Sequence, residues 1–363
     1  MRRFLLPLLL SLSALAGCTG PVRGREIDTL QLVETMGVDG GNGAVILSVS
    51  DSGEEPVRLA ARGRSIPEAA ERLQALSERE ELFYAHIRFA LLGEDAARAG
   101  AGEVLDWFRR SPQTRLAVPL LVVRAGDARA LVAGDGASER EITGLLRSLQ
   151  EDSERNGGPH DFTMLEITRQ LSRSGAALCA AVRAVPPGES IPGESAPAVL
   201  ADGYAVLKDG ALAGFLDPGA ARGANLLLGR TGAAEYVLSG ATVRLRGAKV
   251  RREVVPGPEG APRLTVTAEL RAALVGRTGE GPLTEEELAR METELSRRIA
   301  GETDAALKGV RDAGADAFGL WEEHRDAPDR EAFLRSLTWE IAVSAAVERS
   351  YDTDGGVYLE GEG

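Results

Sequence analysis

The chain reads LFYAHIRFALLGE at residues 82–94, and this stretch decides the fold class. From His86 to Leu92 apolar side chains alternate with polar ones and then run on without interruption, which is typical of a buried strand. The helical pattern over 94–110 follows, with a break at 100–102, and LAVPLLVV at 116–123 predicts a second buried strand. Within that strand Pro119 indicates a bulge or an edge, because proline cannot donate to a strand ladder. Strands and helices that alternate along the chain predict an α/β or α+β fold.

The residues before this stretch predict a hairpin and a helix. Two β-patterned segments, 32–39 and 44–50, are joined by GGNG at 40–43, which is a hairpin signal. Ser65 is followed three residues later by Glu68, which is the spacing of a capping box at a helix start.

The rest of the chain continues the same mixture. In the middle we expect helices over 139–150, 162–171 and 218–228, a strand over 177–185, a proline-rich loop over 186–197 and a hairpin over 199–216. In the last third we expect strands over 235–238, 241–253, 263–276 and 339–349, with a short helix around 318–324. A long helix is predicted from the capping box at Thr284, with an apolar stripe of Leu288, Met291, Leu295 and Ile299 and an end at Ala313-Gly314.

We interpret these elements as an α+β (mixed α/β) fold of three domains, each a small mixed sheet with packed helices. The predicted division is a signal peptide at 1–17, an N-terminal α/β domain at 18–135 and a middle α/β domain at 136–228. A C-terminal domain at 229–351 follows, with the long helix packed on a β-sheet, and then a polar tail at 352–363.

Composition excludes several classes of protein. The chain has 363 residues, a formal net charge of −13, two cysteines and 4% aromatic residues. The acidic balance argues against a nucleic-acid binder, which needs a basic face. Two cysteines exclude a disulfide-dense scaffold, and scarce aromatic residues argue against a stacking platform for bases or sugars.

The first eighteen residues predict export and lipid anchoring. Two arginines precede an apolar run over 4–16, which is too short to span a bilayer but fits a secretory signal. The run ends in Leu15-Ala16-Gly17-Cys18, which resembles a bacterial lipobox, so Cys18 is the predicted lipid anchor. Cleavage before Cys18 removes two arginines and changes the net charge from −13 to −15. The alternative is an ordinary signal peptide with an incidental cysteine.

The sequence offers no catalytic constellation. His86, His160 and His324 are the three histidines, and none has a second metal ligand at useful spacing. Nucleophile-elbow and phosphate-loop motifs are missing, so we predict no catalytic residues, no metal and no cofactor. Cys179 lies in an apolar run, which favours a buried structural residue over a nucleophile.

Several motifs in order resemble the Ger(x)C lipoprotein family, the C subunits of spore germination receptors. After the lipobox come MGVD at 36–39, GRS at 63–65 and the stretch at 82–94. Near the end, AGADAFGL at 313–320 is similar to the family's turn after a long helix, and the strand from Trp339 also fits.

The resemblance implies a lipid-anchored, non-catalytic subunit of a nutrient germinant receptor on the outer face of the spore inner membrane. Its implied partners are A- and B-type integral membrane subunits, with membrane contact through the N-terminal lipid, no nucleic acid and no predicted small-molecule ligand. The candidate interaction or family-motif residues are Asp39, His86, Arg88, Gly314, Asp316 and Gly319. For His86 and Arg88 the alternative is strand packing with a surface charge. For the segment from Gly314 to Gly319 it is a helix C-cap and turn.

Two other functions remain open at this stage. A lipid-anchored extracytoplasmic solute-binding protein fits the domain count, although scarce aromatic residues and the lack of a two-lobed βα repeat weigh against it. An exported hydrolase has no supporting motif. We also expect anionic lipid headgroups to repel an anchored body with a charge of −15.

Overall fold

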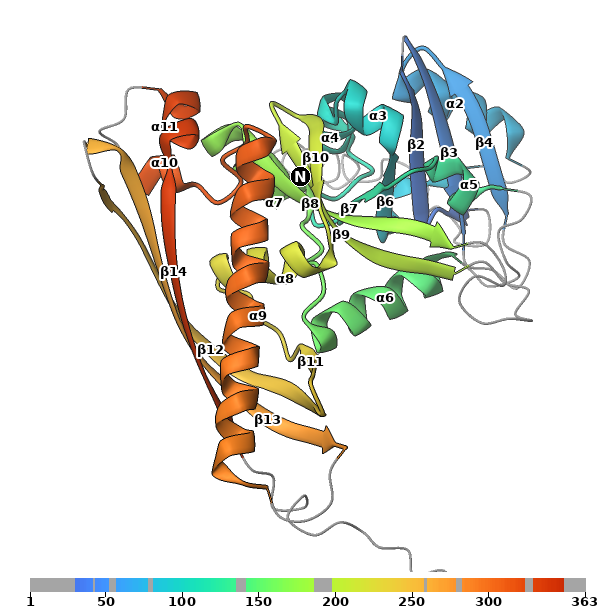
Figure 1. Ribbon diagram of the computed structural model, residues 1–363. Coiled ribbons are helices and arrows are strands. Elements are labelled where there is room, and N and C mark those ends of the chain that lie inside the picture. Colours follow the sequence, from blue (N-terminus) through green and yellow to red (C-terminus); the bar gives the residue numbers. More distant parts are fainter. Residues whose placement is uncertain are drawn as a thin grey trace, which may run out of the picture.

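Strand β6 (Phe89–Gly93) lies inside a mixed eight-stranded sheet of the computed structural model (Figure 1). The strand order is β10-β9-β8-β7-β6-β2-β3-β4. The other strands are β2 (Thr35–Gly41), β3 (Ala44–Ser50), β4 (Arg58–Gly63), β7 (Leu120–Val123), β8 (Ala176–Val185), β9 (Ala198–Lys208) and β10 (Ala211–Leu216). Strands β2, β6, β7 and β8 run parallel, and antiparallel strands complete both ends of the sheet. This architecture confirms the predicted mixed α/β fold class.

The structure describes residues 30–41, 43–51, 57–77, 81–134, 142–185, 198–257, 260–278, 283–323 and 329–348. The predicted signal peptide, Cys18, the loop at 186–197, His324 and the tail at 352–363 lie outside the described residues.

The strand that was predicted from His86 begins three residues later, at Phe89. Tyr84–His86 form a short 3-10 helix, η2, after strand β5 (Glu81–Phe83), which pairs with β1 (Leu30–Leu32). The backbone carbonyl of Glu34 accepts hydrogen bonds from the N–H groups of Arg88 at 2.7 Å and Phe89 at 3.3 Å. The chain therefore joins the sheet only at these residues, which side-chain alternation alone does not locate.

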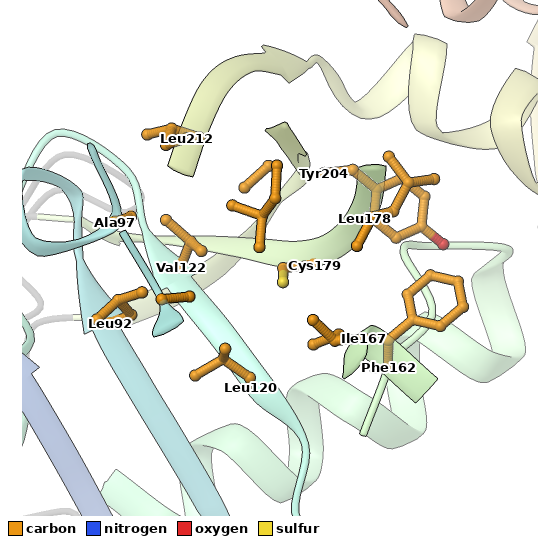
Figure 2. Packing of buried hydrophobic residues seen from close by; sticks show 14 of the residues in the cluster. Leu92, Ala97, Leu120, Val122, Phe162, Ile167, Leu178, Cys179, Tyr204 and Leu212 are labelled. Carbon is orange, nitrogen blue, oxygen red and sulfur yellow. The ribbon is translucent and has the colours of Figure 1, made fainter. Parts of the chain in front are cut away.

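Helices cover both faces of this sheet because its central strands carry apolar side chains on each face. Leu91 and Leu121 pack with α5 (Ala128–Val132) and α6 (Ile142–Asn156). Leu92 and Leu120 belong to the core of the opposite face, where Cys179 also lies (Figure 2). The helices of that face are α2 (Ile66–Leu76), α3 (Glu94–Ala99), α4 (Gly102–Arg110), α7 (Met164–Ser174) and α8 (Pro218–Leu227).

Local signals placed most helix and strand boundaries correctly. The hairpin β2–β3 and the break between α3 and α4 form as predicted. Ser65 caps α2, but the carboxylate of Glu68 accepts from the N–H of Arg64 at 2.9 Å, so the reciprocal half of that capping box is wrong. Pro119 precedes β7 and forms an isolated bridge with Thr163, because a residue without an N–H group is tolerated at a strand end.

The C-terminal part is a four-stranded sheet that packs on one long helix (Figure 1). Its order is β11-β12-β13-β14, and the strands are β11 (Glu235–Leu238), β12 (Ala241–Pro256), β13 (Pro262–Arg277) and β14 (Thr338–Glu348). Helix α9 (Glu285–Asp312) lies between this sheet and the rest of the chain, where it contacts α8 and β10. The short helices α10 (Leu320–Glu323) and α11 (Arg330–Ser336) precede β14.

Both ends of α9 form as the sequence predicts. Thr284 and Glu287 make a complete capping box at the start. At the end Gly314 takes a positive φ of 62°, and the N–H of Ala315 donates to the carbonyl of Val310 at 3.0 Å. The N–H of Gly314 donates to the carbonyl of Arg311 at 2.9 Å, which completes a Schellman motif.

Strands from the predicted first and middle domains share the eight-stranded sheet, since β7 pairs with β8 across the predicted boundary at 135/136. The division into three domains stays a prediction. None of the helices in the described part of the chain is long and apolar enough to cross a membrane.

Candidate functional site

Asp39 anchors the start of a helix from within the sheet. It lies near the carboxyl end of β2, where its side chain is buried. Its carboxylate oxygens accept hydrogen bonds from the backbone N–H groups of Ala128 at 2.7 Å and Arg129 at 2.6 Å. Burial raises the pKa of the Asp39 carboxyl above its usual value, while these two hydrogen bonds act in the opposite direction. The two hydrogen bonds hold the start of α5 at the carboxyl end of β2.

Gly93 makes room for this carboxylate. A Cβ atom at position 93 would lie 2.0 Å from Oδ1 of Asp39, so a larger residue would displace this carboxylate. The GVD motif and the end of the 82–94 stretch are therefore two halves of one contact, between β2 and the end of β6.

His86 and Arg88 meet at one buried carboxylate, that of Glu34. The Nε2 atom of His86 lies 3.2 Å from Oε1 of Glu34, and the Nε atom of Arg88 lies 3.4 Å from Oε2. The Glu34 side chain is 7% exposed, whereas the side chains of His86 and Arg88 are 39% and 42% exposed. The cluster thus presents two basic side chains at the surface, held in place by an internal acid. The sequence motifs could not predict this cluster in full, because Glu34 lies outside all of them.

Asp316 repeats the chemistry of Asp39 at the other end of the chain. It is buried, and its carboxylate accepts from the N–H groups of Leu320 and Trp321, both at 2.9 Å. Burial raises the pKa of Asp316, and the two backbone hydrogen bonds act against that rise. Gly319 has a φ of 69° in the turn between them. The GADAFG motif is thus a compact turn that begins helix α10.

The structure places the motif residues at three separate positions. Asp39 and Glu34 are five residues apart, one near the end of β2 and one just before its start, which is about 16 Å along a strand. Asp316 belongs to the turn after α9. Each site joins neighbouring elements, and their carboxylates do not converge on one pocket.

Cys179 is the cysteine that the structure describes, and it is buried in the core as predicted (Figure 2). Burial raises the pKa of its thiol well above the usual value, which keeps it protonated and unreactive. Within the described ranges, no group of three or more His, Cys, Asp or Glu side chains is placed to hold a metal ion.

Sequence patterns missed a buried charge network between α8 and α9. Glu302 is 7% exposed and accepts a hydrogen bond from the Tyr236 hydroxyl at 2.9 Å. It also pairs with Arg222 of α8 and lies 3.4 Å from Nε of Arg298. A signal was available, since Glu302 follows Ile299 by three residues and therefore lies on the apolar stripe of α9.

A second polar cluster lies at the loop between α6 and α7. A cavity of about 190 Å³ is lined by His160, Asp161 and Arg230, among other residues. Burial, together with the nearby charge of Glu154, raises the pKa of Asp161 to about 7. The hydroxyl of Tyr204 accepts the N–H of His160 at 2.6 Å and so fixes the loop.

This pKa predicts a pH-dependent contribution to stability. The folded state binds a proton at Asp161 more tightly than the unfolded state does, so stability is lost as pH rises from about 4 to about 7. We expect the wild-type chain to lose on the order of 2 kcal/mol relative to Asp161→Asn over this range. Urea unfolding at several pH values measures the difference, and the subtraction removes contributions that both chains share, including that of His160.

The control is Asp152→Asn, whose side chain is 63% exposed and pairs with Arg155. Its stability profile should run parallel to that of the wild type. Parallel profiles for Asp161→Asn as well would contradict the raised pKa.

Comparisons with known proteins place these features in one family. A model described as "Spore germination protein N-terminal domain" matches residues 23–184, and "Spore germination B3/ GerAC like, C-terminal" matches residues 202–354. Over 89 residues the chain is 37% identical to "Putative spore germination protein YfkR" of Bacillus subtilis (strain 168). That alignment covers 24% of this chain and 23% of the relative, so it spans about a quarter of each.

A solved structure shares the fold. "Crystal Structure of the GerBC protein" superposes with a TM-score of 0.55 and covers 86% of this chain and 96% of that one, at 15% sequence identity. Together these matches define a spore germination protein of mixed α/β fold. The chain belongs to the Ger(x)C family of germinant receptor subunits, as the motifs predicted.

Proposed function

We propose that this chain is the lipid-anchored, non-catalytic C-type subunit of a nutrient germinant receptor. It is held through Cys18 on the outer face of the spore inner membrane and assembles there with A- and B-type integral membrane subunits. The observation that carries the proposal is the match to both germination family models, which together extend from residue 23 to residue 354 with a gap at 185–201.

The anchor follows from chemistry at the N-terminus. A diacylglyceryl group on Cys18 supplies two chains, and two chains give stable membrane attachment where one gives only marginal binding. The protein then contributes folded surfaces to the complex. The buried motif residues Asp39 and Asp316 support this role, because their hydrogen bonds stabilise the fold that carries those surfaces.

Cys18→Ala is expected to abolish incorporation of a fatty-acid analogue. It should also abolish germination with the same nutrients to which a gene-deletion strain fails to respond. The deletion strain should sporulate normally and fail to germinate with one nutrient or set of nutrients. Labelling is read by in-gel fluorescence, and germination by the loss of optical density of a spore suspension.

Cys179→Ala is the matched control, because this cysteine is buried in the core and is no acceptor for a lipid. It should keep full labelling. Persistent labelling of Cys18→Ala would refute the anchor, and normal germination of the deletion strain with every nutrient, in a strain without a paralogue, would refute the receptor role.

A further inference from the structure

The four-stranded sheet has one face that no described element covers. Helix α9 packs on the inner face, where it contacts β14 and the core between the two sheets (Figure 1). On the outer face the middle strand β13 exposes the polar side chains of Thr267, Glu269 and Arg271, which is the pattern of a sheet with one solvated face. Beside it β14 exposes only small side chains at Ala342, Ser344 and Ala346.

Four cations form what we call the basic stripe on this face: Arg246, Lys249 and Arg251 of β12 and Arg271 of β13. All four are exposed. None of them forms an ion pair or hydrogen bond with another described residue, whereas Arg244 of β12 pairs with Glu235. Glu269, paired in register with Lys249, lies among these cations, and Glu253 lies two residues beyond Arg251 on the same face.

A depression of about 530 Å³ lies within the stripe. Its charged lining residues are Lys249, Arg271 and one acid, Glu269, and small residues such as Gly247, Ser344 and Ala346 line the rest. The depression coincides with a register shift between Leu245 and Gly247, where β12 bends against β13. Small lining residues allow another backbone to approach closely, and the two cations suit carboxylates.

We propose that the basic stripe and its depression bind an extended acidic segment of a partner protein. The proposal rests on the proposed function, in which the partner is an integral membrane subunit of the receptor. Charge complementarity supports it, since unpaired cations gather here on a chain whose net charge is −13.

A protein segment fits this face better than a lipid surface does. Glu253, Glu269 and Glu340 alternate with the cations on the same outer face, and all three are exposed. A planar anionic surface would meet these carboxylates together with the cations, which cancels much of the attraction. A protein segment of defined sequence can place its carboxylates against the cations alone and avoid the acidic positions.

The test is co-purification of the full chain with the A- and B-type subunits, co-expressed and solubilised in detergent. Lys249→Glu/Arg271→Glu is expected to weaken the association about tenfold, because each reversal replaces an attraction by a repulsion. The association of the wild-type chain should also weaken as salt rises from 0.05 to 0.5 M, since exposed charges are screened.

The matched control is Arg147→Glu/Arg169→Glu. These arginines are exposed on α6 and α7, form no ion pair with a described residue, and give the same change in net charge. Equal recovery of both double variants and the wild type overturns the docking surface and leaves the proposed function standing. Failure of the wild-type chain to co-purify with either subunit overturns both.

A photo-crosslinking residue at Ala346, compared with one at Arg147, identifies the occupant. A crosslink from Ala346 to an acidic segment of a receptor subunit supports the proposal. A crosslink to lipid, a crosslink to residues 349–363 of this chain, or no product above that at Arg147 overturns it. Both positions are exposed, so the probe itself should leave the fold intact, which thermal unfolding checks.

Discussion

Gly223→Ala is expected to lower the free energy of unfolding by about 3 kcal/mol. A Cβ atom at position 223 of α8 would lie 2.1 Å from the carbonyl oxygen of Glu302 and 2.6 Å from the backbone nitrogen of Thr303 in α9. Backbone atoms in a 28-residue helix cannot move aside alone, so α8 and α9 must separate. Guanidinium unfolding followed by tryptophan fluorescence measures the loss.

Gly301→Ala is the matched control for this prediction. Gly301 lies inside α9, one residue before Glu302, and a Cβ atom there would meet nothing within 4 Å. Alanine is favoured over glycine in a helix interior, so this variant should gain about 0.5–1 kcal/mol. Similar effects of the two substitutions would show that the close contact of α8 with α9 does not limit position 223.

Glu302→Ala is expected to cost about 3–5 kcal/mol, because it removes one partner of a buried ion pair and leaves Arg222 without its counter-charge. The side chain of Arg222 is 26% exposed, so water replaces only part of what the carboxylate supplies. The hydroxyl of Tyr236 also loses the acceptor that it reaches at 2.9 Å. The same unfolding measurement reports the loss.

Glu286→Ala, on the same helix, separates this effect from the loss of any glutamate. Glu286 is 85% exposed and lies 3.7 Å from Arg290 in a surface ion pair. Such a pair stabilises the fold by about 0.5 kcal/mol or less. The double variant Arg222→Met/Glu302→Leu should recover stability relative to Glu302→Ala, since neither buried charge then remains. If Glu302→Ala costs no more than Glu286→Ala, the network is not buried in solution.

Both predictions concern the junction that orients the C-terminal sheet. Helix α8 packs against β9 and α9, and α9 in turn carries the four-stranded sheet. A loosened junction would therefore turn the outer face, with its basic stripe, relative to the eight-stranded sheet. The proposed docking surface then predicts weaker receptor assembly in Gly223→Ala, with both sheets still folded.

Local sequence signals located much of the fold. The GGNG turn, the capping box at Thr284 and the glycine after α9 act within a few residues, so they can be identified without knowledge of distant contacts. The start of β6 was misplaced because it depends on a carbonyl of Glu34, more than fifty residues away. The sharing of one sheet by β7 and β8 depends likewise on packing rather than on any local pattern.

For the candidate site too, the sequence identified residues but not their contacts. Asp39, His86, Arg88 and Asp316 were singled out by order and spacing, but the sequence could not say that two of them bind helix N-termini and two hold one carboxylate. Glu302 was passed over as one more acidic residue in an acidic helix. Its burial depends on α8, whose position against α9 requires the tertiary fold.

The sequence by itself determined the family, the mixed α/β class and the caps of the long helix, because these depend on residue types at short, fixed spacing. Only the tertiary structure decided where charge is concentrated. A net charge of −13 gives no sign of the basic stripe, which arises because the pairing of β12 with β13 brings Lys249, Arg251 and Arg271 to one uncovered face, with Arg246 at the register shift beside them. Side chains that lie up to 25 residues apart in the sequence become neighbours through strand register, and composition carries no information about register.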